Sequence, residues 1–154
     1  MKKNIGIAFL LILTFTSFTF GQSKSASKDS TSLFMTPKNM TPLGFIEALK
    51  PKDNLESKLG LVTMIDSFPS NWLTKKDIDT LIKLVNSKEK YNCLKNPFSS
   101  YIPINDSADL GGYAIWLIKA YKENISVSFG LHFCPKSNKE DADELIRWWT
   151  KQNK

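Results

Sequence analysis

A nearly continuous run of apolar residues between Asp109 and Lys122 is the feature that most constrains the fold of this 154-residue chain. Apolar residues recur on every side of the helical wheel here, which is typical of a helix that is buried all round. They are Leu110, Tyr113, Ala114, Ile115, Trp116, Leu117, Ile118, Ala120 and Tyr121. We therefore expect a buried central helix over about 109–123, capped by Ser107 or Asp109.

Two adjacent glycines, Gly111 and Gly112, fall in the first turn of this expected helix. Such glycines can expose backbone N–H groups that bind an anion, or they can let a neighbouring segment approach closely. Asp106 and Asp109 stand beside the pair, and their negative charges oppose a bound anion. We therefore favour close packing over an anion site.

Four further segments carry helix-start signals and apolar residues at helical spacing. The signals are a Thr followed by Pro at the first helical position, or a Ser, Thr or Asp followed three residues later by an acidic residue. The four segments begin at Thr41, Asp53, Thr74 and Ser137. The second carries an apolar stripe that ends at Ile65, so we expect a helix over 53–65.

Residues 125–133 show a different pattern, in which apolar residues alternate with polar or small ones. Period two is typical of a β-strand, but an isolated strand is not stable. Residues 87–106 contain two Pro and several Ser and Asn, so they exclude a long helix. We predict a mostly α fold, with four or five short helices packed around the buried central helix and a small extended segment at 125–133. The alternative is an α+β fold with a small two- or three-stranded sheet formed by 91–104 and 125–134.

The first 21 residues have the features of a cleaved secretory signal peptide. Lys2 and Lys3 precede a short apolar run, and Gly21 is the small residue at the exit. A membrane anchor is the alternative, but the strongly apolar run is shorter than the roughly 20 residues that a span needs. We therefore expect a signal peptide at 1–21, a flexible Ser/Lys-rich tether at 22–40 and a single globular helical domain at 41–154. The mature protein is expected to be exported, either periplasmic or secreted, with no membrane span.

The charge of the chain argues against one class of partner. The formal net charge is +6, and loss of Lys2 and Lys3 with the signal peptide leaves a mildly basic chain. Its Lys residues are spread along the sequence and Arg147 is its only Arg, whereas nucleic-acid-binding proteins usually gather Lys and Arg on one face. We therefore expect no nucleic-acid partner.

Cys93 and Cys134 are the only cysteines, and one lies on each side of the central helix. Oxidising compartments favour disulfides, so we predict a bridge between them. Two alternatives use the single histidine, His132: a zinc site with both cysteines, and a nucleophilic Cys–His pair. A structural zinc site needs four ligands, and oxidation removes the thiolate that a nucleophile needs. We therefore expect the disulfide, with no metal and no cofactor.

Carboxylates near two expected helix starts could instead pair for acid–base chemistry. They are Asp106, Asp109, Glu140, Asp141, Asp143 and Glu144. Negative charge at a helix start interacts favourably with the helix dipole. We therefore attribute these carboxylates to helix stability.

Four residues are candidates for binding a partner. Arg147 and Trp148 stand side by side on the last expected helix, and Trp and Arg are frequent interface anchors. Tyr101 and Asn105 lie in the long irregular stretch before the central helix, and such loops are often functional.

These observations point to two functions of different class. The first is a small, exported, non-catalytic interaction protein: a binding, inhibitor or immunity-type module that docks another protein. It follows from small size, export, one disulfide and the lack of an assembled catalytic motif in the sequence. The second is a small periplasmic hydrolase or lyase that uses His132 with a carboxylate.

Overall fold

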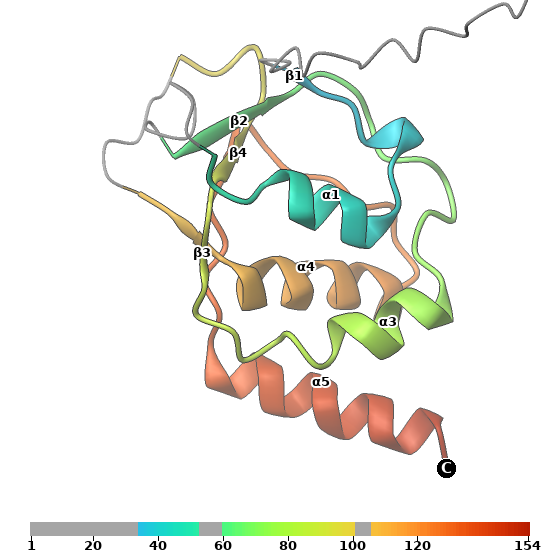
Figure 1. Cartoon of the computed structure of the whole chain (residues 1–154). Coiled ribbons are helices and arrows are strands. Elements are labelled where there is room, and N and C mark those ends of the chain that lie inside the picture. The colour runs from blue at the N-terminus through green and yellow to red at the C-terminus, as the bar shows by residue number, and fades with distance from the viewer. Residues whose placement is uncertain (1–33, 53–59, 101–105) are drawn as a thin grey trace, which may run out of the picture. The chain divides into compact units, whose positions relative to one another are not determined.

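The computed structural model describes residues 34–52, 60–100 and 106–154 (Figure 1). The predicted signal peptide at 1–21, the predicted tether up to residue 33, and the candidate residues Tyr101 and Asn105 lie outside these ranges. Within them the chain has an α+β fold, with four α-helices, one 3-10 helix and two sheets. No helix among the described residues is long and apolar enough to cross a membrane.

The larger sheet has the strand order β1-β2-β4-β6. β1 (Phe34–Met35), β2 (Leu61–Met64) and β4 (Cys93–Lys95) run parallel, and β6 (His132–Phe133) pairs antiparallel with β4. Parallel neighbours need crossover connections. Helix α1 (Pro42–Ala48) lies in the connection from β1 to β2, and α3 (Lys75–Leu81) lies in the connection from β2 to β4. The three parallel strands therefore end at the same edge of the sheet.

Both crossover helices begin where the sequence predicts. The Thr41 hydroxyl accepts a 3.1 Å hydrogen bond from the Gly44 N–H at the start of α1. At the start of α3, Thr74 and Asp77 form a capping box, in which each side chain accepts from the backbone N–H of the other. A short 3-10 helix, η1 (Pro37–Asn39), precedes α1.

The central helix is confirmed as α4 (Leu110–Lys122), and most of its residues are buried. It contacts both α3 and the last helix, α5 (Lys139–Gln152). The predicted cap of α5, Ser137, is wrong by one residue: the Asn138 side chain accepts the hydrogen bond from the Asp141 N–H at 2.8 Å. The buried Ser137 hydroxyl instead donates to the Val85 carbonyl oxygen at 2.9 Å.

Close packing at the glycine pair is confirmed. A Cβ atom on Gly111 would lie 2.5 Å from the Val85 carbonyl oxygen, and one on Gly112 would lie 2.5 Å from that of Pro135. The Gly111 N–H donates to the Ser87 carbonyl oxygen at 3.1 Å. Neighbouring backbone therefore occupies the place that an anion at this helix start needs.

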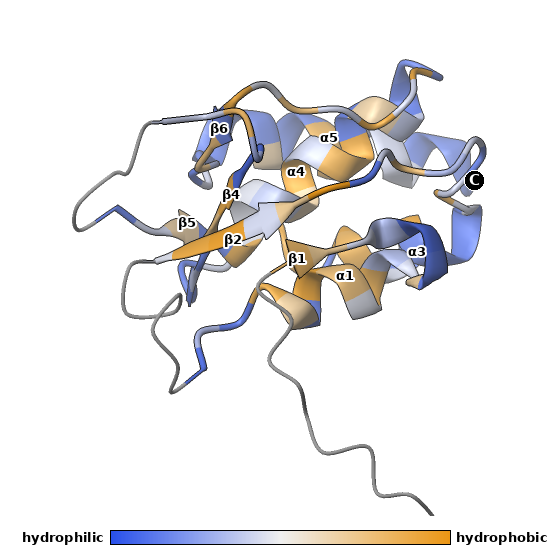
Figure 2. Ribbon diagram, turned by 90° about the horizontal axis from the view of Figure 1, so that it is seen from above, coloured by the Kyte–Doolittle hydropathy of each residue, from blue (hydrophilic) through white to orange (hydrophobic). Residues whose placement is uncertain are grey.

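A second, two-stranded antiparallel sheet leads into α4. Its strands are β3 (Lys90–Tyr91) and β5 (Ala108–Asp109), with Lys90 opposite Asp109. Figure 2 shows hydrophobic residues along β2 and α1 and hydrophilic residues along α3. The core between the larger sheet and the helices includes fully buried Phe45, Leu94 and Leu117.

The prediction of a mostly α fold is wrong, because the larger sheet has four strands. The α+β alternative names the right class, but it omits β1 and β2. The segment at 61–64, expected to belong to a helix over 53–65, is strand β2; residues 53–59 of that expected helix lie outside the described ranges. Parallel pairing with β1 and β4 outweighs the helical spacing of the apolar residues here.

Two boundaries also differ from expectation. Residues 34–40, assigned to the predicted tether, contribute β1 and η1, so the ordered fold extends further towards the N-terminus than residue 41. The predicted extended segment at 125–133 is a regular strand only at His132–Phe133. Its alternating face is only partly buried, since Val127 is buried whereas Ile125 and Leu131 are exposed.

Candidate functional site

A groove of about 340 Å³ lies where β2 and β4 end. Segments 64–68 and 96–98, which include the end of β2 and follow β4, line it together with residues 127–129. In sheets with parallel strands, ligands commonly bind outside the carboxyl ends of the strands. The groove has this position.

Exposed apolar side chains gather around this groove. Phe98 is 90% exposed and Ile65 is 55% exposed, and both line the groove. Leu131 and Phe34 are also exposed apolar residues near this edge. The Leu131 carbonyl oxygen accepts a hydrogen bond from the Asn96 N–H. Phe34 directly precedes Met35, whose carbonyl oxygen accepts a hydrogen bond from the Ile65 N–H. Such a gathering of exposed apolar side chains marks an interaction site more often than scattered ones do.

The wall of the groove is anchored in the core by aromatic packing. The Phe68 ring centre lies 5.1 Å from that of Phe45, 4.8 Å from that of Trp72 and 5.6 Å from that of Trp116. Ring pairs in this range add to the free energy of burial. Phe68 therefore gives the groove a rigid apolar wall, whereas Phe98 projects into solvent.

A second cavity of about 450 Å³ lies between the segment 69–73 and the end of α4 with residues 124–127. Trp72, Tyr121 and two asparagines with positive φ, Asn71 (54°) and Asn124 (53°), are among its lining residues. Asparagine adopts this backbone conformation more readily than most residues. Val127 lines both cavities, so the two adjoin.

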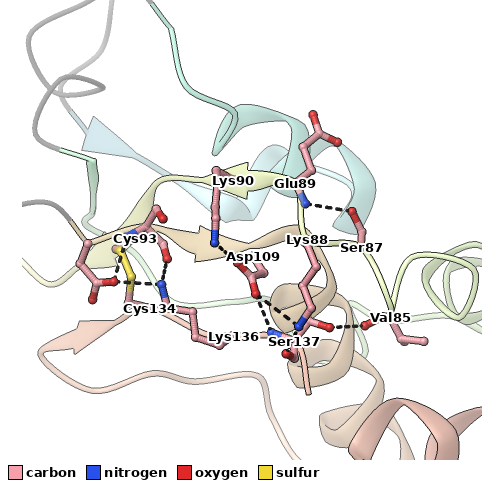
Figure 3. A network of polar contacts seen from close by, with 12 residues as sticks. Val85, Ser87, Lys88, Glu89, Lys90, Cys93, Asp109, Cys134, Lys136 and Ser137 are labelled. Carbon is pink, nitrogen blue, oxygen red and sulfur yellow. Dashed lines mark hydrogen bonds and ion pairs between the residues drawn. A yellow bond between two sulfur atoms is a disulfide. The ribbon is translucent and has the colours of Figure 1, made fainter. Parts of the chain in front are cut away.

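The predicted disulfide between Cys93 and Cys134 is present, with a Cα–Cα distance of 4.6 Å (Figure 3). The pairing of Leu94 with Phe133 places the two cysteines opposite each other across β4 and the continuation of β6. This Cα–Cα separation lies within the range that disulfides adopt. The bridge therefore fixes the pairing of the last strand with the parallel part of the sheet.

His132 and Asp106 lie beside this disulfide. One potential ligand atom from each of Cys93, Asp106, His132 and Cys134 lies within 4.8 Å of all the others. Cys93 is fully buried, and the His132 Nε2 atom is shielded from solvent. The sequence alone suggests Cys93, His132 and Cys134 as a possible set of zinc ligands, and the structure adds Asp106.

Hydrogen bonds hold the Asp106 carboxylate in place. Its Oδ1 atom accepts from the Ser107 N–H at 2.8 Å and from the Lys136 ammonium at 3.0 Å. Burial alone raises the pKa of Asp106, but these two hydrogen bonds and the positive charge of Lys136 lower it overall. Asp106 is therefore a carboxylate, not a neutral acid, at neutral pH.

Asp109 has a structural role (Figure 3). It is only 3% exposed, and it accepts hydrogen bonds from the Lys90 ammonium at 2.8 Å and from the Ser137 N–H at 3.1 Å. Burial raises the pKa of Asp109, but these bonds and the nearby charge of Lys88 lower it overall. The carboxylate joins β3, the start of α4 and the segment before α5.

Two other carboxylates considered for acid–base chemistry, Asp141 and Glu144, each form an ion pair with a lysine. Asp141 pairs with Lys119 at 2.7 Å, and Glu144 pairs with Lys122. Both pairs join α5 to α4. This arrangement supports the expectation that these side chains stabilise helices.

The candidate binding residues on α5 lie away from both cavities, since neither Arg147 nor Trp148 is among the lining residues. Arg147 is exposed, and Trp148 is half-buried with its ring 5.3 Å from that of Trp149. The Lys122 ammonium lies 5.9 Å from the Trp148 ring centre, within the range of a cation–π contact. Trp148 therefore packs largely within its own protein.

Sequence reasoning missed the groove residues Ile65, Phe68, Phe98 and Phe129. Ile65 fits the last position of a helical stripe in the sequence, and this pattern conceals its place beside the groove. Phe98 carried a usable signal, because a large aromatic directly after Asn96-Pro97 interrupts an otherwise polar turn. The meeting of the groove's three segments depends on the tertiary fold.

The features that bear on function are thus the groove at the carboxyl ends of the parallel strands and the Cys–His–Asp cluster beside the β4–β6 pair. Comparison with known proteins adds no family to them. No protein-family model, no curated protein and no solved structure matches this chain significantly.

Proposed function

We propose that this chain is an exported, non-catalytic interaction module, of a binding, inhibitor or immunity type, that docks another protein through the groove at the carboxyl ends of β2 and β4. The observation that carries the proposal is the exposure of Phe98 and Ile65 beside a groove with a rigid aromatic wall. Exposed aromatic and aliphatic anchors next to a preformed pocket are the usual core of a protein interface.

The chemistry of the groove favours binding over catalysis. Its lining residues are mainly apolar, with Ser and Asn side chains between them, and Asp66 is the one titratable side chain among them. Acid–base catalysis usually needs two positioned titratable groups or one with a tuned pKa. An apolar side chain of a partner fits this lining better than a reacting polar substrate does.

The charge of the chain suggests the character of the partner. The net charge of the full chain is +6, and the Lys residues that remain after loss of Lys2 and Lys3 are spread along the sequence. A chain of net positive charge favours encounter with an acidic partner. The disulfide supports an oxidising location for this encounter, as the signal-peptide pattern does.

One observation supports the alternative function, a small hydrolase or lyase. Asp106 lies within 4.8 Å of His132 by their ligand atoms, as a His–carboxylate pair requires. Neither of the two cavities includes His132 in its lining, however. We therefore retain the enzyme only as an outcome of the test below.

The test compares charged substitutions in and outside the groove. Tagged chain is used to capture proteins from the periplasm and medium of the native host, and binding is then measured with the purified captured protein. Phe98→Asp and Ile65→Asp should each weaken binding by about 30-fold or more, as expected for anchor residues. Ile125→Asp is the matched control for Ile65→Asp, because Ile125 is about as exposed as Ile65 but lines the adjoining cavity, outside the groove.

Two outcomes contradict the proposal. Binding that survives both groove substitutions places the interface elsewhere. Binding lost through His132→Ala, together with an activity that this variant lacks, favours the enzyme instead. Circular dichroism of each variant ensures that loss of binding is not loss of folding.

A further inference from the structure

The cluster of Cys93, Asp106, His132 and Cys134 has the composition of a metal site. Their four potential ligand atoms, two sulfurs, one imidazole nitrogen and one carboxylate oxygen, lie within 4.8 Å of one another. We infer that reduction of the disulfide turns this cluster into a four-ligand Zn²⁺ site. The cluster lies along the β4–β6 pair, from Cys93 at the start of β4 to His132, which pairs with Lys95 at its end. None of its four residues lines the binding groove.

The donor set and its spacing suit zinc. Zn²⁺ binds thiolate sulfur at about 2.3 Å, imidazole nitrogen at about 2.0–2.1 Å and carboxylate oxygen at about 2.0–2.2 Å, in tetrahedral geometry. These bond lengths place neighbouring donors about 3.3–3.8 Å apart. The present spread of up to 4.8 Å needs only a small contraction for most donor pairs, while the two sulfurs separate after reduction.

Strand pairing and a backbone hydrogen bond hold the four candidate ligand residues in place. His132 and Cys134 are two residues apart on an extended segment, so their side chains share one face. Cys93 lies opposite Cys134 through the β4–β6 register, and Asp106 is fixed through the Ser107 N–H. Ligands that packing and hydrogen bonds hold in place bind a metal with less loss of conformational entropy.

The chemistry requires a two-electron reductant, such as a pair of thiols. Two reductant thiols, R–SH, break the Sγ–Sγ bond of Cys93 and Cys134, which gives two protein thiols and one oxidised R–S–S–R. The electrons pass from the reductant sulfurs to the protein sulfurs. Zn²⁺ then binds the two thiols as thiolates and releases two protons. A dithiol of the thiol–disulfide oxidoreductase class, or dithiothreitol in the test tube, supplies this step.

Lys136 opposes the metal electrostatically. Its ammonium lies 3.0 Å from the Asp106 Oδ1 atom, so a zinc ion on this carboxylate is repelled at short range. The Lys136 side chain is half-exposed and can turn into solvent. Removal of this charge should therefore strengthen zinc binding.

The experiment titrates Zn²⁺ into the full chain, reduced with a phosphine under anaerobic conditions, against a chromophoric zinc chelator. One Zn²⁺ should bind per reduced chain, and the oxidised chain should bind at least about 100-fold more weakly because it lacks both thiolates. Co²⁺ in place of Zn²⁺ should give the thiolate-to-metal absorption of a tetrahedral site. His132→Ala and Asp106→Ala should each lower zinc affinity about 10-fold or more, and Lys136→Met should raise it.

Asp66→Ala is the control, since Asp66 is a carboxylate of the binding groove, outside the cluster. Zn²⁺ should also raise the melting temperature of the reduced chain, and less so that of His132→Ala. The inference is overturned if the reduced chain binds no zinc, whether folded or unfolded. It is also overturned if the His132 and Asp106 variants match the Asp66 variant in affinity. Partner binding at the groove is measured separately, so failure of either proposal leaves the other testable.

Discussion

The Tyr113 hydroxyl donates a 2.6 Å hydrogen bond to the Asn92 carbonyl oxygen, and so joins the buried helix α4 to the short link between β3 and β4. Tyr113 is fully buried, and burial raises the pKa of its phenol well above 10. The hydroxyl therefore stays protonated as a donor throughout the range in which proteins are stable. This one bond ties the central helix to the strand that carries Cys93.

Tyr113→Phe should destabilise the protein by about 1–2 kcal/mol, because it leaves the Asn92 carbonyl oxygen without this buried donor. Urea unfolding monitored by circular dichroism measures the change in the free energy of unfolding. Tyr121→Phe is the matched control, since its ring is only partly buried, and it should change stability by less than about 0.5 kcal/mol. Equal effects of the two substitutions would show that the bond to Asn92 contributes little.

Gly111→Ala should be severely destabilising, by about 3 kcal/mol or more, because the new methyl group overlaps the Val85 and Ser87 carbonyl oxygens. Both contacts are backbone atoms that cannot turn aside. Gly130→Ala provides the comparison, because a Cβ there meets no atom within 4 Å. The yield of soluble protein and the melting temperature should separate the two variants clearly. Wild-type stability in Gly111→Ala would refute the close approach of these segments.

Reduction of Cys93–Cys134 in the presence of a metal chelator should lower the free energy of unfolding by up to about 4 kcal/mol. The bridge spans 41 residues, and the figure follows from the loop-closure entropy of the unfolded chain. The double variant Cys93→Ala/Cys134→Ala should show a loss of similar size that no longer responds to reductant. If reductant leaves wild-type unfolding unchanged, the bridge does not constrain the unfolded chain.

Asp109→Asn should cost about 2–3 kcal/mol at neutral pH, because a buried carboxylate that binds Lys90 and the Ser137 N–H loses its charge. The folded-state pKa of Asp109 lies below its ordinary value of 3.8. Its contribution to stability is therefore complete above 3.8 and is lost as the pH falls through the lower folded-state pKa.

The difference in unfolding free energy between wild type and Asp109→Asn should accordingly stay level well above pH 3.8 and shrink as the pH falls below 3.8. Chemical denaturation at several pH values measures this difference directly. A difference that grows towards acid pH would mean that the folded protein raises the pKa of Asp109.

Local signals account for what the sequence predicts correctly. Thr41, Thr74 and the apolar run after Asp109 each act through neighbours within one or two helical turns, so α1, α3 and α4 were predictable. The disulfide followed from a count of two cysteines and the expected compartment. None of these inferences needs knowledge of distant contacts.

The sheet was not predictable because its strands are too short to show a period. β1 and β6 contain two residues each, and the four residues of β2 also fit a helical stripe. Their stability comes from pairing with segments about 30 to 40 residues away in the sequence. The groove and the placement of Asp106 beside His132 were not predictable either, because both depend on contacts between segments that are distant in the sequence.

The segment from His132 to Ser137 connects more of the molecule than any pattern in its sequence suggests. It pairs with β4 and carries Cys134. The Pro135 carbonyl oxygen accepts a hydrogen bond from the Asp109 N–H, and the Ser137 hydroxyl donates one to the Val85 carbonyl oxygen. Because these contacts reach the sheet, the disulfide, the start of α4 and the turn after α3, we expect them to open together. In hydrogen-exchange terms, the protected amides around this segment belong to one cooperative unit, and they should exchange with deuterium only when the whole domain unfolds.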